Sequence, residues 1–329
     1  MHAGMADYAL RAATLSHSEA VMALTELHDR LPPYHSPVAR DEAPATSCNA
    51  GRLVADAAAH DRFFHVRRVF QSEATVFLRG IIMAAALFHT EMESAYGARD
   101  GRRFAALGSG IAALLGHIGE VRVAPLEHVA AVALAEPASV DPMRRWVLGH
   151  QIFAALTQGI IFELQELEAA IRALEHDRAR DALGLAGDLL MASAEAFRFT
   201  ADFFPSAYTD VVRPRMMAQH VGEGFSGVLS ADHRRLVAVL VRTRPLMGEI
   251  ATHFATEHKR LTVALDQVYD AHKYVCARFV GEKKPSLRCP NSSPMAGVAQ
   301  LDQYHRGRAG LLRSDSRTAT VTTDTVTLE

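Results

Sequence analysis

The sequence has few of the features that define several large classes of protein. It contains only 3 cysteines and 1 tryptophan among 329 residues. Cys48, Cys276 and Cys289 are too few and too widely spaced for a disulfide framework. The absence of any Cys-x-x-Cys pair excludes the usual structural zinc motifs. The formal net charge of -2 provides no electrostatic basis for binding nucleic acid or an acidic membrane.

Targeting and membrane-spanning features are also scarce. The first residues, MHAGMADYALRAATL, have mixed charge and lack the apolar region of a secretory signal. The longest apolar stretches, such as residues 80–88, are far shorter than the ~20 residues that a membrane span needs. We therefore expect a cytoplasmic protein that binds neither membrane nor nucleic acid, and a homo-oligomer remains open.

What the sequence does contain is helical periodicity in a globular composition, 49% hydrophobic and 22% charged. No convincing strand pattern occurs apart from a weak alternation in residues 317–328, so we predict an all-α, multi-helix bundle. The expected organisation is an N-terminal helix and linker (1–50), a main helical domain (51–290) and a mobile tail (291–329). Helical spacing is found in residues 5–30, 51–97, 102–120, 142–174, 178–203, 231–256 and 259–281.

The most informative local pattern is a histidine and a cysteine one helical turn apart, His272 and Cys276. Side chains at i and i+4 point the same way, about 6 Å apart along the axis. An imidazole there can bind a metal, and the thiol can reach the rim of a flat cofactor. The alternatives are an incidental pair in the core, or a zinc site that recruits His258 and Cys289 without any supporting spacing.

A second histidine, His233, precedes this pair by 38 intervening residues. Ser230 is a predicted N-cap, which places His233 in the first helical turn. The positive end of a helix disfavours imidazolium, and a metal ligand must be neutral. The alternative is a histidine in a solvated first turn.

A third histidine, His150, shares a helix face with Trp146 and Phe153. An aromatic face with one titratable group suits a planar aromatic substrate, with His150 as a hydrogen-bond partner or base. The alternative is a core histidine that is satisfied by a backbone carbonyl.

Three segments together resemble a known family. They are RRWVLGHQIFAALTQG (144–159), the span from YTDVVRPRMM to SADHRRL (208–236), and VYDAHKYVCARFVGEKKPSL (268–287). They resemble the histidine-ligated haem-dependent aromatic oxygenases, the superfamily of tryptophan 2,3-dioxygenase. One branch, which hydroxylates tyrosine-type amino acids in antibiotic biosynthesis, carries a His-xn-His-x3-Cys motif with n near 38, as found here. The resemblance covers about residues 140–290.

The resemblance implies a haem (iron protoporphyrin IX) with His272 as proximal iron ligand and His233 as second axial ligand. It implies a single thioether from Cys276 to a haem vinyl group, since the Cys-x-x-Cys-His attachment signature is absent. His150 would face the substrate as the catalytic residue. Trp146 and Phe153 would lie against the cofactor.

The activity that the resemblance implies is hydroxylation of the ring of a tyrosine or 3-methyltyrosine type of amino acid to a catechol. The oxidant would be dioxygen with an external reductant, or hydrogen peroxide. The loop Gly-Thr-Gly-Gly of tryptophan dioxygenases is replaced by Gly281-Glu282-Lys283-Lys284, which weakens the case for indole cleavage. The expected candidates for binding the substrate carboxylate are Arg144, Arg145, Arg213 and Arg215.

Three other functions stay open at this point. The chain could be a tryptophan-dioxygenase-like oxygenase that acts on an indole. It could be a non-catalytic bis-histidine haem protein for electron transfer or sensing. It could also be a helical bundle without a cofactor.

Overall fold

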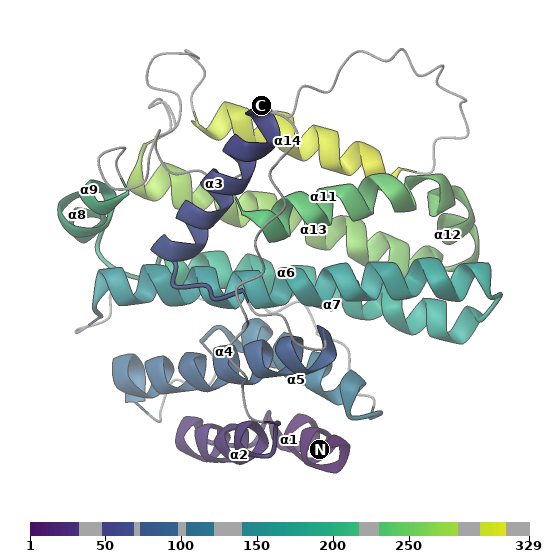
Figure 1. The fold of residues 1–329 in the computed structure, drawn as a ribbon, viewed down its shortest axis with the longest axis horizontal. Coiled ribbons are helices and arrows are strands. Elements are labelled where there is room, and N and C mark those ends of the chain that lie inside the picture. Colours follow the sequence, from purple (N-terminus) through teal and green to yellow (C-terminus); the bar gives the residue numbers. More distant parts are fainter. Residues whose placement is uncertain are drawn as a thin grey trace.

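The structure is a computed structural model, and it describes residues 1–32, 48–68, 73–97, 103–121, 140–216, 230–281 and 297–313. The described residues form helices and contain no strand, which confirms the all-α prediction. Figure 1 shows the helices stacked in layers. The expected linker at 34–50 and the alternation at 317–328 lie outside the described residues, apart from the start of one helix at Cys48.

Two long antiparallel helices form the centre of the fold, α6 (Pro142–Arg172) and α7 (His176–Thr200). α6 begins where the sequence predicts, because Asp141 caps it: its Oδ1 accepts hydrogen bonds from the backbone N–H groups of Met143 and Arg144 at 2.9 and 3.1 Å. Pro142 occupies the first turn, where it is tolerated. The core face of α6 recurs every three or four residues, as in Leu148, Ile152, Leu156, Ile160, Leu164 and Leu167.

The remaining helices cover the two sides of this central pair (Figure 1). On one side, α11 (Ala231–Thr243) packs on α6, and α13 (Ala255–Phe279) packs on α7 and carries α14 (Gly297–Leu312). On the other side, α4 (Glu73–Tyr96) contacts α6, and α5 (Ala105–Ile118) contacts α7. Outermost are α1 (His2–Arg11) on α5 and α2 (His17–Asp29) on α4.

α6 and α7 approach each other closely at Gly149. A Cβ atom added there would lie 2.7 Å from Thr200 Cβ and 3.0 Å from Thr200 Cα. Because the second of these atoms belongs to the backbone, any larger residue at 149 would push the two helices apart. The glycine therefore sets the spacing of the two helices directly beside His150.

Three of the predicted helical segments are interrupted in the structure. The single helix expected at 5–30 is divided into α1 and α2, because Ser16 and Glu19 form a capping box that starts α2. The helix expected at 231–256 is divided into α11 and α12 (Met247–His253) by a 3-10 turn, Arg244–Leu246, which contains Pro245. The helical segment expected at 51–97 is divided into α3 (Cys48–Phe63), which begins three residues earlier than expected, and α4; residues 64–68 after α3 are not helical.

The segment between the helices expected at 178–203 and 231–256 and the expected C-terminal tail both contain helical structure. Residues 205–215 form α8 (Pro205–Ala207), a π-helical segment η2 (Tyr208–Val212) and α9 (Arg213–Arg215). In the tail, α14 packs against α13 through a hydrogen bond from Lys273 to Asp302 (3.2 Å) and one between His305 and Asp266 (2.7 Å).

Among the residues that the structure describes, two helices are long and apolar enough to cross a membrane by length and composition alone, Thr75–Tyr96 and Pro142–Arg172. Half of the first apolar window and 61% of the second are buried inside the protein. Core helices of globular proteins meet the same criteria, and both helices contribute to the core described above.

Candidate functional site

His272 lies on α13 with its ring stacked on Phe197 from α7. The two ring centroids are 4.6 Å apart and the planes differ by 15°. Burial, together with a smaller effect of the nearby His233, lowers the pKa of His272 to about 4. At neutral pH the imidazole is therefore uncharged, and one ring nitrogen has a free lone pair.

His233 projects from the first turn of α11, as the sequence predicts. Ser230 is the N-cap, and its Oγ accepts a hydrogen bond from the His233 backbone N–H at 3.4 Å. Burial lowers the pKa of His233 to about 4, and the charges of Arg308 and Arg234 act in the same direction. Two neutral imidazoles from α11 and α13 thus lie close enough to influence each other electrostatically.

Cys276 lies one turn after His272 on α13 and is partly buried. Burial raises the pKa of its thiol to about 11, so the sulfur is protonated at neutral pH. A charge on Cys276 would raise the pKa of Tyr208, which places these two side chains near each other. The structure therefore brings the thiol to the same region as the two histidines.

His150 is held between two aromatic rings. Its centroid lies 4.0 Å from that of Phe64, with the planes 11° apart, and 4.8 Å from that of Trp146. Nδ1 of His150 donates a hydrogen bond to the Trp146 carbonyl oxygen at 2.8 Å, because a carbonyl can only accept. This fixes the tautomer and leaves Nε2 as the acceptor.

The charge state of His150 is set by its surroundings. Burial lowers its pKa to about 3; the Trp146 carbonyl opposes this shift, and His60 and His272 add to it. An imidazole with so low a pKa accepts a hydrogen bond but does not retain a proton at neutral pH. His272 stacks on Phe197, and Phe197 contacts Phe153, which lies one turn after His150 on α6. His233 lies near enough to His272 to affect its pKa, so the three predicted histidines lie in one region.

Aromatic rings continue around this region. Phe153 contacts Phe197 with centroids 4.8 Å apart, so both lie on the side of His272. Trp146 contacts Tyr208 with centroids 5.4 Å apart. The indole N–H of Trp146 is buried and has no acceptor among the described residues, which leaves a donor for a bound molecule.

Tyr208 begins the π-helical segment η2. Single π-turns occur often at functional sites, because the extra residue in the turn redirects side chains. The Tyr208 ring stacks on Phe279 of α13, with centroids 4.5 Å apart and planes 4° apart. η2 thereby packs against the same helix that carries His272 and Cys276.

The four candidate arginines differ in their surroundings. Arg145 is fully buried, with Nε 3.2 Å from Glu91 Oε1 and Nη1 3.6 Å from Asp202 Oδ2. Arg144 Nε lies 3.2 Å from the other Glu91 oxygen. The charge of Arg213 lowers the pKa of Tyr208, against the larger effect of burial, so this arginine lies close to the aromatic region. The fourth candidate, Arg215, is exposed.

Several residues of the region escape sequence reasoning. Phe64 and Phe197 reach it from the segment after α3 and from α7, without any motif. Tyr208 begins one of the segments that carry the resemblance, but nothing in that segment assigns it to the site. Arg278 shares α13 with His272 and donates a hydrogen bond from Nη2 to the Phe203 carbonyl at 3.2 Å. The one local signal is that Arg278 lies two residues after Cys276. The aromatic contacts depend on tertiary packing, which periodicity in one segment cannot reveal.

The fold and the site define a helical protein whose centre gathers neutral histidines, a thiol and aromatic rings. The chain belongs to the SfmD 3-methyl-L-tyrosine peroxygenase family, whose family model matches residues 2–264. His150 and His233 lie inside the matched range, whereas His272 and Cys276 follow it. Membership of the wider tryptophan 2,3-dioxygenase superfamily stays a prediction.

One curated relative illustrates the similarity. The chain is 28% identical to a 3-methyl-L-tyrosine peroxygenase of Streptomyces lavendulae over 207 residues, which is 62% of this chain and 56% of that protein. The aligned part therefore spans little more than half the length of the relative. No solved structure matches the chain.

Proposed function

We propose that this protein is a haem-dependent peroxygenase that hydroxylates the ring of a tyrosine-type amino acid to a catechol, in natural-product biosynthesis. The observation that carries the proposal is the meeting of neutral His272 and His233 beside the aromatic wall around His150. The family and the relative's name support it. A 3-methyltyrosine-like compound is the substrate that this support favours.

The residues present fit a haem. Within the described residues, no three His, Cys, Asp or Glu side chains converge to hold a bare metal ion. A pair of neutral histidines suits a haem iron, and His272 and His233 are the residues that would hold it. Cys276 would form the thioether, and the Trp146 N–H would donate to a carboxylate or carbonyl. When bound, the haem iron would supply the activation of the peroxide O–O bond.

His150 would orient the substrate. Its tautomer leaves Nε2 as an acceptor for the phenol O–H, and the stacked Phe64 ring keeps the imidazole from rotating. Because the pKa of His150 is lowered to about 3, His150 holds the phenol by a hydrogen bond and does not remove its proton in the resting complex. Such positioning selects the ring carbon next to the hydroxyl.

The substrate carboxylate requires a cation that is not already committed. Arg144 and Arg145 both bind Glu91. Arg213 lies near Tyr208 and the site, so we assign it as the carboxylate partner. Arg213→Gln should raise KM for the amino acid more strongly than it lowers kcat, because uniform binding is lost.

We assign hydrogen peroxide as the oxidant. One peroxide oxygen replaces a ring hydrogen as hydroxyl, and the other leaves as water, so the atoms balance without an external reductant. Dioxygen with a reductant is the alternative, and assays with each oxidant alone separate the two. Product formation only with dioxygen and reductant would exclude the peroxygenase reaction.

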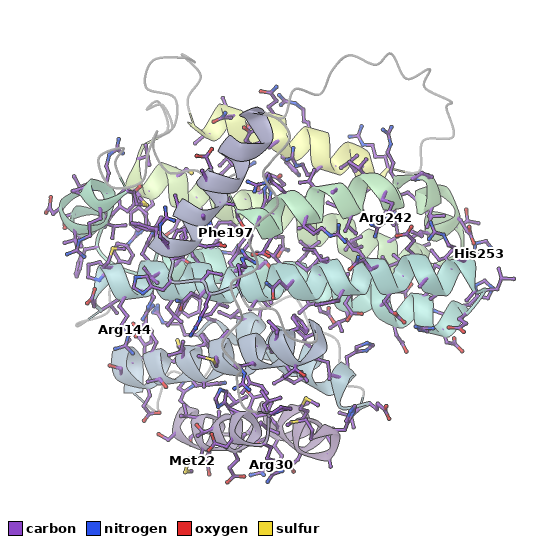
Figure 2. All side chains as sticks on the ribbon, in the orientation of Figure 1. Met22, Arg30, Arg144, Phe197, Arg242 and His253 are labelled. Carbon is purple, nitrogen blue, oxygen red and sulfur yellow. The ribbon has the colours of Figure 1, made fainter. Side chains whose placement is uncertain are left out.

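The cofactor assignment is tested on purified protein. We expect a Soret band, loss of haem in His272→Ala, and haem that becomes extractable by acid acetone in Cys276→Ala. His253→Ala is the matched control, because His253 is exposed and lies at the opposite end of the molecule from Arg144 (Figure 2). Absence of a Soret band after haem reconstitution would overturn the proposal.

The activity is tested by mass spectrometry of products from a panel of tyrosine, 3-methyltyrosine and tryptophan with peroxide. We expect a gain of one oxygen on the phenols and a large loss of product in His150→Phe. A haem-loaded protein that oxidises none of the panel would contradict the enzymatic assignment and indicate a bis-histidine electron-transfer or sensor protein. Oxidation of tryptophan alone would indicate an indole oxygenase.

A further inference from the structure

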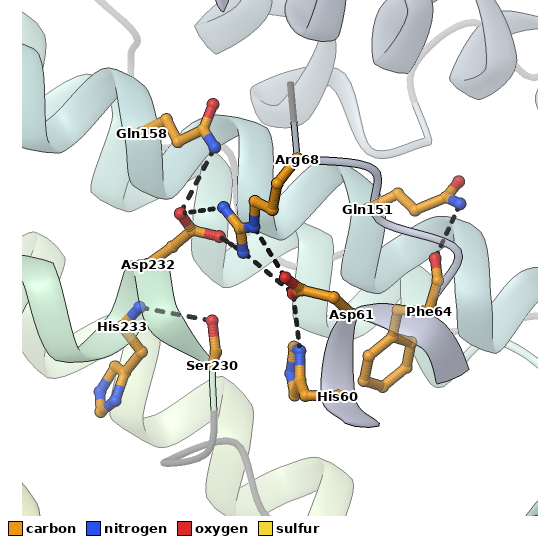
Figure 3. A network of polar contacts seen from close by, with 9 residues as sticks. All are labelled: His60, Asp61, Phe64, Arg68, Gln151, Gln158, Ser230, Asp232 and His233. Carbon is orange, nitrogen blue, oxygen red and sulfur yellow. Dashed lines mark hydrogen bonds and ion pairs between the residues drawn. The ribbon is translucent and has the colours of Figure 1, made fainter. Parts of the chain in front are cut away.

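An arginine after α3 binds two carboxylates at once, as Figure 3 shows. Arg68 donates from Nε and Nη2 to Asp61 at 2.8 and 2.9 Å, and from Nη1 and Nη2 to Asp232 at 2.8 and 2.9 Å. Burial raises the pKa of Asp61, but hydrogen bonds from His60 and Arg68 overcome this effect and lower it to about 2. Both pairings are therefore charge-assisted and bidentate. We call this arrangement the Arg68 clasp.

The clasp reaches the turn that carries His233. Asp232 immediately precedes His233 in α11, and its carboxylate is buried. Gln158 of α6 also donates to it at 3.4 Å (Figure 3). The cap of this turn is a long hydrogen bond, 3.4 Å from the His233 N–H to Ser230 Oγ. Arg68 is thus the strongest described polar hold on the first turn of α11.

The other end of the clasp reaches the aromatic rings that surround His150. The chain turns sharply after α3, where the Val66 N–H donates to the Asp61 carbonyl at 2.8 Å. This turn presents Phe64, whose ring stacks on His150 at 4.0 Å. Gln151, the neighbour of His150, donates to the Phe64 carbonyl at 2.9 Å (Figure 3). One short segment therefore contacts His150 at Phe64 and the His233 turn at Arg68.

We propose that Arg68 is a positioning residue. It couples the aromatic rings around His150, those of Phe64 and Trp146, to the ease with which His233 dissociates from the iron. The inference rests on the proposed function. Movement of His233 away from the iron displaces the first turn of α11, which breaks the bidentate contact of Asp232 with Arg68. A substrate held at His150 presses on the segment that carries Phe64, and this segment reaches the same contact through Asp61.

The geometry makes this clasp releasable. The Arg68 side chain is 38% exposed, whereas those of Asp61 and Asp232 are 13% and 10% exposed. Water reaches the guanidinium but not the two carboxylates, so the strength of this contact lies between that of an exposed ion pair and that of a fully buried one. A fully buried Arg68–Asp232 pair would hold the first turn of α11 in place, and without the pair this turn would move more easily. A coupling of about fivefold is the scale expected for such a contact.

The first test needs no cofactor. Hydrogen–deuterium exchange is measured for residues 231–238 in the purified full chain, for wild type, Arg68→Gln, Arg68→Lys and Arg62→Gln. Arg62 is exposed and close in sequence, so it is the matched control. We expect exchange to rise about fivefold or more in Arg68→Gln, less in Arg68→Lys, and not in Arg62→Gln. Unchanged exchange in Arg68→Gln would overturn the proposal.

The second test reads the iron ligand. Cyanide is titrated into the ferric haem-loaded protein, where it competes with His233 for the sixth position. We expect its apparent Kd to fall about fivefold in Arg68→Gln, to fall less in Arg68→Lys, and to stay unchanged in Arg62→Gln. Because Arg68→Lys keeps the charge, an effect confined to Arg68→Gln would reflect electrostatics and would contradict a positioning role.

The two tests separate failure of this inference from failure of the proposed function. If the protein binds no haem, the proposed function fails, and the exchange experiment still measures whether Arg68 holds the α11 turn. If haem binds and both Arg68 variants match wild type in exchange and in cyanide affinity, the proposed function stands and the coupling is wrong.

Discussion

Replacement of Gly149 by alanine tests whether the close contact between residue 149 of α6 and Thr200 of α7 limits the stability of the fold. The added methyl group would lie 2.7 Å from Thr200 Cβ and 3.0 Å from Thr200 Cα. Ordinary carbon contacts lie near 3.5–4.0 Å, so relief requires movement of α6 away from α7. A change of Thr200 rotamer cannot remove the contact with its backbone.

The magnitude follows from two opposing effects. Overpacking in a core costs about 1–3 kcal/mol. Alanine in place of glycine in a helix contributes a gain of about 1 kcal/mol. Because a backbone atom is among the clashing atoms, we expect the cost to fall in the upper part of its range and Gly149→Ala to lose about 1–2 kcal/mol of unfolding free energy.

Gly184 provides the matched control, because it lies within α7 and a Cβ added there meets nothing within 4 Å. Gly184→Ala should therefore gain about 0.5–1 kcal/mol. Thr200→Ala added to Gly149→Ala should recover only part of the loss, since the Cβ and Cα of residue 200 remain. Urea unfolding followed by far-ultraviolet circular dichroism measures all three variants. Equal stability of Gly149→Ala and Gly184→Ala would refute the reasoning.

Two further predictions concern buried charge. His89 is buried against Tyr8 and His17, and burial lowers its pKa from 6.5 to about 4. As pH falls, the unfolded chain takes up the proton before the folded protein does, so unfolding free energy is lost between pH 6.5 and about pH 4. Between pH 7 and pH 5 the wild type should lose about 2 kcal/mol more than His89→Leu, as measured by urea unfolding. Arg145→Leu leaves the buried carboxylates of Glu91 and Asp202 with weaker pairing and should lower the unfolding free energy by about 3 kcal/mol. Arg180→Leu removes an exposed ion pair with Asp177 and should change the unfolding free energy little in the same assay.

The helices could be read from the sequence where local signals are strong. Asp141 and Pro142 mark the start of α6, and the apolar repeat carries it to Arg172. The break between α1 and α2 was missed although Ser16 and Glu19 are visible, because the apolar period continues across it. Pro245 likewise divides a pattern that periodicity alone presents as one helix.

The site was predictable in part. His150, His233 and His272 were identified from spacing and resemblance, and the structure brings them into one region. Phe64 and Phe197 could not be identified, since each contacts a histidine on a helix distant in sequence. The Arg68–Asp232 pair spans 164 residues, and no local pattern encodes a contact of that range.

The position of Trp146 has a spectroscopic consequence. It is the sole tryptophan of the chain and lies against both His150 and Tyr208. Intrinsic tryptophan emission from the whole protein therefore originates at the site. A chromophore or an aromatic amino acid that binds there should change that emission directly, so this protein carries its own optical probe for binding at neutral pH.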